Sequence, residues 1–154
     1  MISIPAVLKS PHIDVSISAP DTASAVSGLL ELLRGDPRVM KWDDFQQAVV
    51  ARDTSPIASN GCGILIAHGR TNSVASLVMA AGISKQGISH PAGGTPPIHV
   101  VFVAGIPAAF NNDYLRVVGT IARLCSQKDL LTSLLDSSSP SEFLSTLSLE
   151  EDRL

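Results

Sequence analysis

One histidine could take part in chemistry because of the apolar run that leads into it. Residues 64–67 read Ile-Leu-Ile-Ala, and His68, Gly69 and Arg70 follow directly. A neutral imidazole is nucleophilic near pH 7, and an adjacent guanidinium can donate hydrogen bonds to phosphate oxygens. Gly69 would let the backbone come close to a bound group. The pattern indicates a histidine presented for reversible phosphoryl transfer.

The neighbouring residues predict the strands that hold this histidine. Residues 64–67 form an apolar run typical of a buried strand, so we expect His68 at the end of a strand, where α/β sheets commonly place ligand chemistry. Two further apolar runs, 74–83 and 98–106, predict central strands, with a loop over 84–97 between them. A turn-rich stretch, 54–63, precedes the histidine strand. These runs predict a central sheet.

Helical patterns flank the predicted sheet on both sides in the sequence. Alternation over residues 13–17 predicts a first short strand, and Asp21 can then cap a helix that ends at Gly35. A second helix should begin at Asp43 or Asp44. The last third is helical, with a capping box over 139–142. The order of elements predicts one α/β domain over residues 1–154.

Composition excludes several classes of protein. Of the 154 residues, 45% are hydrophobic and 16% charged, and the net charge is -3, which argues against a disordered chain, a nucleic-acid partner or an anionic membrane surface. The longest apolar run, 98–110, is too short to span a bilayer, and the first residues do not resemble a signal peptide. We therefore expect a cytoplasmic protein.

The remaining reactive side chains have simpler interpretations. His99 lies in a predicted buried strand and should be a core histidine with a hydrogen-bond partner. His90 should be exposed in a loop, and His12, before the first strand, should be structural. Cys62 is interpreted as a small residue in a tight loop, because no base is evidently paired with it. Neither cysteine belongs to a metal-binding or disulfide pattern.

Other functions remain to be weighed against phosphoryl transfer. A histidine after a strand is more often a surface or hydrogen-bonding residue than a nucleophile, and Arg52 at a helix end is ordinarily a solvated charge. An apolar strand followed by His-Gly also begins the oxyanion loop of many α/β-hydrolases, but the sequence has no Gly-x-Ser-x-Gly. A nucleotide site is excluded because there is neither a P-loop nor a glycine-rich turn that opens a helix.

Three segments in order resemble a known family. They are Arg52-Asp53, the stretch Gly61-Cys62-Gly63-Ile64-Leu65-Ile66-Ala67-His68-Gly69-Arg70, and Pro97-Ile98-His99-Val100-Val101-Phe102. Their order and spacing resemble the EIIA domain of the fructose, mannitol and nitrogen-regulatory branches of the bacterial phosphotransferase system. The resemblance extends from Ile13 to about Leu147. The match from Arg52 to His68 needs no insertion.

The resemblance implies a mixed sheet flanked by helices, with His68 and Arg52 as catalytic residues. His68 would accept a phosphoryl group from the phosphocarrier protein HPr or a relative, and Arg52 would help to hold it. Gly69, Arg70 and Tyr114 would support the phosphate site. The phosphate would pass to an EIIB domain or serve as a regulatory signal. No metal or organic cofactor is expected.

Three departures from the family pattern bear on activity. Ala67 replaces a proline, Gly94-Thr95 replaces Asp-Gly, and Tyr114 stands where the family carries a second histidine. A phenol can donate a hydrogen bond to phosphate, but it cannot carry a positive charge. These departures favour slower transfer. They also keep open an alternative, a regulatory interaction module of the same fold with weak or no phosphotransfer.

Overall fold

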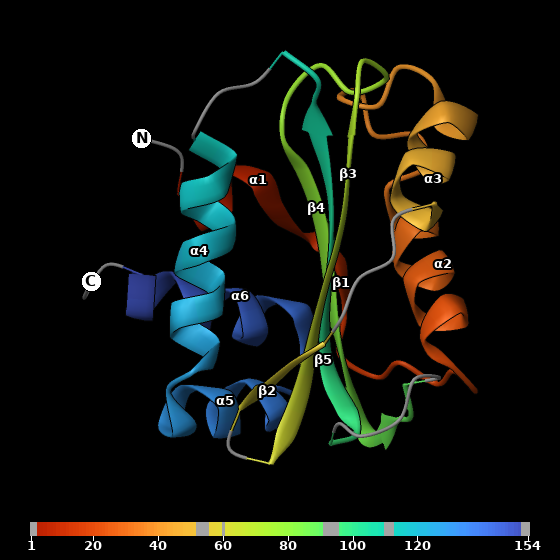
Figure 1. Ribbon diagram of the computed structural model, residues 1–154. Coiled ribbons are helices and arrows are strands. Elements are labelled where there is room, and N and C mark those ends of the chain that lie inside the picture. Colours follow the sequence, from red (N-terminus) through yellow and green to blue (C-terminus); the bar gives the residue numbers. More distant parts are fainter. Residues whose placement is uncertain (1–2, 52–55, 60, 91–95, 110–112, 152–154) are drawn as a thin grey trace.

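A sheet between two layers of helices is the framework of the molecule (Figure 1). The computed structural model describes residues 3–51, 56–59, 61–90, 96–109 and 113–151, with the backbone alone for 57–59 and 113–115. Two helices cover one face: α2 (Thr22–Leu32) and α3 (Trp42–Val50). The other face is covered by four: α1 (Ile4–Val7), α4 (Asp113–Cys125), α5 (Lys128–Leu135) and α6 (Pro140–Glu151).

The sheet is mixed, with the strand order β1-β4-β5-β3-β2. The pairs β1–β4 and β3–β5 are parallel, while β4–β5 and β2–β3 are antiparallel. The expected mixed sheet flanked by helices is therefore confirmed. The strands are β1 (Leu8–Asp14), β2 (Ile57–Ser59), β3 (Cys62–Thr71), β4 (Val78–Ile88) and β5 (Ile98–Pro107).

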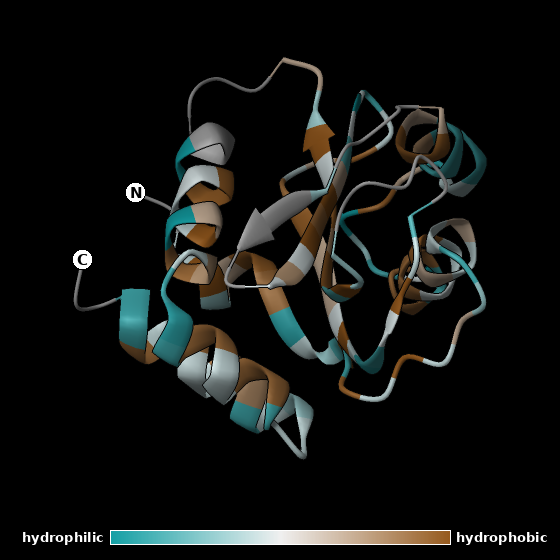
Figure 2. Ribbon diagram, turned by 60° about the horizontal axis from the view of Figure 1, so that its bottom comes forward, coloured by the Kyte–Doolittle hydropathy of each residue, from teal (hydrophilic) through white to brown (hydrophobic). Residues whose placement is uncertain are grey.

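Strand alternation divides the core into two halves. In β3, Ile64 and Ile66 contribute to the half under α4, α5 and α6, whereas Leu65 and Ala67 contribute to the half under α2 and α3. Figure 2 shows the hydrophobic residues of the helices turned toward the sheet and the hydrophilic ones turned outward. Burial of the central strands on both faces explains their continuous apolar runs.

The helix starts were predicted more accurately than the strand ends. Asp21 is the N-cap of α2, as expected, and Gly35 follows the helix with a φ of 88°. Half of the capping box predicted at α6 is present: the Ser139 hydroxyl accepts from the Glu142 backbone N–H at 3.2 Å, while the Glu142 carboxylate accepts from the Ser138 hydroxyl at 2.9 Å. α3 begins at Trp42, one residue before the earlier of the two expected starts.

Three of the strands differ from their predictions. The first strand is Leu8–Asp14 rather than 13–17, and it contains His12. β2 lies inside the stretch predicted as turns. β4 begins at Val78, not at residue 74, and continues to Ile88 through residues predicted as loop, because pairing with β5 resumes at Ile88–Ile98 after a register shift. Alternation and apolar runs in the sequence indicate which residues are buried. Hydrogen bonding to a neighbouring strand can extend a strand past its buried residues.

Asp21→Ala should lower the urea concentration at the midpoint of unfolding. The carboxylate accepts the Ser24 backbone N–H at 2.8 Å, which satisfies a donor that has no intrahelical partner. Urea denaturation measures the difference. Asp21→Asn, which keeps an acceptor, is the control and should lose less; equal losses in the two variants would contradict the capping role.

The described helices include none that is both long enough and apolar enough to cross a bilayer.

Candidate functional site

His68 lies inside β3 rather than at its end. The strand continues to Thr71, and the parallel register with β5 runs without interruption from His68–Ala104 to Thr71–Pro107. The expectation of a strand-end position was wrong because this unbroken pairing extends the strand beyond the apolar run. The imidazole is half-buried. It is therefore neither walled off in the core nor fully solvated.

His68 lies on the part of β3 beyond the pairing of that strand with β2. β2 pairs only with Cys62–Ile64, so no described strand covers the outer side of β3 at the histidine. Alternation puts His68 and Arg70 on the same face as Ile64 and Ile66, which pack under α4. The histidine therefore faces the layer formed by the C-terminal helices.

The first turns of α4 run alongside this part of β3. β5 ends at Pro107, opposite Thr71, and α4 begins six residues later at Asp113. At the other end of α4, Cys125 lies near Cys62 of β3. Burial, and to a smaller extent the nearby Cys62, raises the pKa of the Cys125 thiol to about 12. Thirteen helical residues and the strand from Cys62 to His68 each span about 20 Å. The helix start therefore lies near the level of His68 and Arg70.

One ring nitrogen of His68 faces a backbone acceptor. Nδ1 lies 3.4 Å from the carbonyl oxygen of Ile66, which is long for a hydrogen bond. A carbonyl can only accept, so this contact favours the tautomer that carries its proton on Nδ1. The lone pair of that tautomer is on Nε2.

Gly69 has a structural role that the sequence did not reveal. A Cβ at this position would lie 2.6 Å from the carbonyl carbon of Ala48 and 2.7 Å from the Val49 nitrogen. The backbone of α3 therefore lies directly against β3 at the residue after His68. Close helix packing, on the face opposite the imidazole, accounts for glycine here.

The chain after Arg70 is held by a second loop. The Met40 backbone N–H donates to the Ser73 carbonyl at 2.7 Å, and the Ala75 N–H donates to the Arg38 carbonyl at 2.8 Å. The Ser73 N–H also donates to the Thr71 hydroxyl at 3.1 Å. The end of β3 is thereby tied to the α2–α3 connection.

An ion pair within that connection anchors it to the sheet. Asp36 binds Arg38 through both carboxylate oxygens at 2.8–2.9 Å, and the guanidinium also donates to the Val7 carbonyl at 3.1 Å. The side chains are 6% and 19% exposed. Hydrogen bonding to Arg38 lowers the Asp36 pKa, and burial lowers that of His12, whose Nε2 lies 3.6 Å from Asp36. Sequence analysis missed this pair; its only signal was Asp-x-Arg after Gly35.

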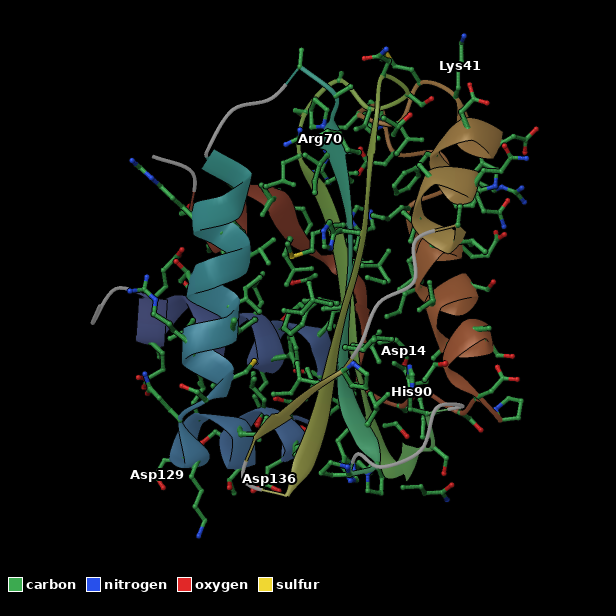
Figure 3. All side chains as sticks on the ribbon, in the orientation of Figure 1. Asp14, Lys41, Arg70, His90, Asp129 and Asp136 are labelled. Atoms are coloured by element: carbon green, nitrogen blue, oxygen red, sulfur yellow. The ribbon has the colours of Figure 1, made fainter. Side chains whose placement is uncertain are left out.

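The other predicted site residues lie next to His68 in β3 or, in whole or in part, outside the described residues. Arg70 is exposed near one end of the sheet (Figure 3). Arg52 lies outside the described residues, as do Gly94-Thr95 and the side chain of Tyr114, whose backbone is in α4. Ala67 is buried in β3.

His99, His90 and Cys62 are accounted for by their own surroundings. His99 is half-buried and its Nδ1 lies 2.8 Å from the Ser84 carbonyl, which confirms a histidine with a structural partner. His90 is half-buried, not exposed as predicted, and Figure 3 places it well away from Arg70. Burial raises the Cys62 pKa, as suits an unreactive thiol. Within the described ranges, no three His, Cys, Asp or Glu side chains could hold a metal ion together.

Comparison with known proteins defines the class of this chain. Residues 6–149 match the family model described as "Phosphoenolpyruvate-dependent sugar phosphotransferase system, EIIA 2", so the chain belongs to that family. It is 28% identical over 127 residues to the fructose-specific EIIA component of Haloferax volcanii, covering 81% of this chain and 82% of that protein. It is 22% identical to the fructose-specific EIIABC component of Bacillus subtilis, covering 90% of this chain but only 22% of that longer protein.

Solved structures share the fold. The nitrogen regulatory protein IIA-Ntr of Neisseria meningitidis superposes with a TM-score of 0.82 at 21% identity, covering 94% of this chain and 98% of that one. IIA mannitol in complex with phosphorylated IIB mannitol from Escherichia coli gives 0.73 at 17% identity, covering 92% and 98%. At these identities the likeness establishes the fold alone.

Proposed function

We propose that this chain is a phosphohistidine carrier, which takes a phosphoryl group on His68 and passes it to another protein. The observation that carries the proposal is a half-buried imidazole on the part of β3 beyond its pairing with β2, within a family whose members belong to a phosphotransferase system. We propose further that residues 1–154 act as one domain and that the protein works in the cytoplasm.

The chemical step is a transfer between two imidazoles. The lone pair of His68 Nε2 attacks the phosphorus of a phosphohistidine on the donor protein. The donor's P–N bond breaks as the new N–P bond forms, and its electron pair returns to the donor imidazole. The proton on His68 Nδ1 stays in place, near the Ile66 carbonyl oxygen 3.4 Å away.

The surrounding groups would stabilise the charge of the transferred phosphoryl group. Catalysis of this step is mostly positioning and charge neutralisation. Arg70 follows on the same strand face as His68, and Arg52, two residues after the end of α3, would supply a second guanidinium. The N-terminal end of α4 carries the positive end of the helix dipole toward this end of the sheet. Tyr114 would donate its hydroxyl to a phosphate oxygen.

The donor is an HPr-like phosphocarrier protein, and the acceptor is an EIIB domain or a regulatory target. Two relatives are fructose-specific components, and one similar structure is a complex with phosphorylated IIB. The complex with phosphorylated IIB supports a protein partner on the acceptor side of the transfer. Because both substrates are proteins, the sugar is recognised elsewhere.

Incubation with enzyme I, HPr and phosphoenolpyruvate tests this function. Intact-mass analysis should show one added phosphoryl group within minutes, and the group should be lost in acid, as phosphohistidine is. Omission of HPr is the control. An unchanged mass with an HPr that phosphorylates another EIIA in the same mixture would contradict the carrier function.

Tyr114→His should raise the rate of phosphorylation by HPr about tenfold. An imidazolium next to the phosphate would replace a neutral donor with a charged one, and tenfold corresponds to about 1.4 kcal/mol of transition-state stabilisation. Because the unperturbed histidine pKa is about 6.5, the gain should be larger at pH 6 than at pH 8. Quenching the phosphorylation reaction at successive times and measuring the intact mass of the protein gives the rates.

Tyr114→Phe is the matched variant for this prediction. It removes only the hydroxyl and should slow the transfer severalfold if that hydroxyl donates to the phosphate. If Tyr114→His does not raise the transfer rate and Tyr114→Phe does not lower it, Tyr114 does not contact the phosphoryl group.

A regulatory interaction module is the second candidate function. The fold similarity to IIA-Ntr and the neutral residue at position 114 favour it. In that case phosphate would reach His68 slowly, and partner binding would be the same for the phosphorylated and unphosphorylated forms. The transfer assay above distinguishes the two functions by rate.

A further inference from the structure

Two glycines lie side by side in the sheet beneath α3. Gly69 of β3 pairs with Gly105 of β5, and alternation turns both toward the layer of α2 and α3. A Cβ on Gly69 would lie 2.6 Å from the Ala48 carbonyl carbon, and one on Gly105 would lie 2.5 Å from Cε1 of Phe45. We call Gly69 and Gly105 the glycine pair.

The glycine pair lets α3 rest on the sheet at two successive turns. Phe45 and Ala48 are three residues apart and therefore lie on one side of the helix. The ring of Phe45 is fully buried over Gly105, and the helix backbone itself meets Gly69. A side chain at either glycine would lift the helix, because native cores have no room for an added methyl group.

The position of α3 bears on the site through two connections. Gly69 is bonded directly to His68, so a displaced backbone at Gly69 displaces the imidazole. At the C-terminal end of α3 the cap residue Ala51 donates to the Gln47 carbonyl at 2.9 Å, and Arg52 is the next residue. His68 is therefore bonded to Gly69, which contacts α3, and Arg52 is bonded to Ala51, the C-cap of α3.

We propose that the glycine pair positions the phosphoryl-transfer site by fixing the distance between α3 and the strand that carries His68. This inference rests on the proposed function and extends it to residues that touch no phosphate. Gly105 in particular is a positioning residue, since it lies on β5, and a Cβ there would meet the ring of Phe45 first, at 2.5 Å, and Cγ1 of Val78 at 3.0 Å. A misplacement of about 1 Å in such a site can reduce a rate up to a hundredfold.

The test compares rates of phosphorylation by HPr in folded variants. Gly69→Ala and Gly105→Ala should each lose about tenfold or more in kcat/KM. Phe45→Leu should restore most of the rate of Gly105→Ala, because removing the ring makes room for the methyl group. It should not restore Gly69→Ala, whose methyl group would meet helix backbone.

Gly82→Ala is the matched control. A Cβ there would lie 2.6 Å from the Asp14 carbonyl oxygen and from Cδ1 of Ile17, so it disturbs the connection after β1 and not α3. It should lower the melting temperature while leaving the transfer rate within about twofold of the wild type, as expected for a site that is not displaced. Gly28→Ala, with nothing within 4 Å of the new atom, should leave the transfer rate unchanged and raise the melting temperature, because alanine is favoured over glycine inside a helix such as α2.

The outcomes separate this inference from the function it rests on. If the wild type takes no phosphate, the proposed function fails. If the wild type is phosphorylated and both glycine-pair variants, folded by circular dichroism, keep the wild-type rate, the positioning role is wrong. It is equally wrong if Gly82→Ala loses as much rate as they do, or if Phe45→Leu leaves Gly105→Ala slow.

Discussion

His68→Gln should leave a folded protein that accepts no phosphate from HPr. The substitution keeps a polar side chain of similar size at a half-buried position and removes the nucleophilic nitrogen. Loss of a nucleophile typically costs at least about a thousandfold in rate, and here no covalent product can form without it. Intact-mass analysis after incubation with enzyme I, HPr and phosphoenolpyruvate measures the loss.

His90→Gln is the control for this substitution. His90 is also half-buried, but it lies far from Arg70 (Figure 3), so the variant should be phosphorylated at the wild-type rate. A His68→Gln protein that still gains the phosphoryl group would assign the chemistry to another residue.

Arg38→Ala should be among the most destabilising single changes in this chain, lowering the free energy of unfolding by about 3 kcal/mol. Asp36 is 6% exposed and would lose its bidentate partner, which leaves a carboxylate in a site that excludes water. The Val7 carbonyl would lose the donor that now lies 3.1 Å away. Urea denaturation gives the difference.

Arg34→Ala is the matched control because its ion pair with Glu31 is on the surface. The two side chains are 59% and 53% exposed, so with the loss of its contact over Trp42 the variant should cost about 1 kcal/mol or less. Equal losses at Arg34 and Arg38 would contradict the anchoring role of the Asp36–Arg38 pair.

The same pair predicts a pH dependence. Hydrogen bonding to Arg38 lowers the Asp36 pKa in the folded state, so its stabilising contribution is complete above the unfolded-state value of about 3.9. The contribution is lost as pH falls through the lower folded-state value. The stability difference between wild type and Arg38→Ala should therefore shrink below about pH 4. Between pH 7 and pH 5 the titration of His12 also contributes, because burial and the charge of Arg38 lower its pKa.

The fold was largely predictable because its local signals agree with one another. Asp21 before an apolar helical stripe, and Ser139 three residues before Glu142, are capping patterns that depend only on nearby residues. The central strands were recognisable because burial on both faces leaves no polar residue to interrupt them. The ends of β3 and β4 were not recognisable from the sequence, because hydrogen bonding to β5 determines them. The residues of one segment do not indicate how far its partner strand extends.

The candidate site was predictable only in part. His68 was found from its local setting, and Arg52 and Tyr114 entered through resemblance to a family. The true surroundings of Gly69 depend on Ala48 and Val49, about twenty residues earlier, and no local pattern indicates that contact. The Asp36–Arg38 pair was missed for the same reason, because its burial depends on Val7 and Leu77 from two other segments.

The attachment point of the phosphoryl group tests the central claim most directly. Nitrogen-15 NMR of histidine-labelled protein, before and after transfer from HPr, observes each ring nitrogen of the four histidines. We expect the signals of one imidazole, His68, to change, with the new bond at Nε2 and the proton kept on Nδ1. Unchanged His68 signals in a protein whose mass has increased, or a phosphoryl group on any other ring, would contradict the claim.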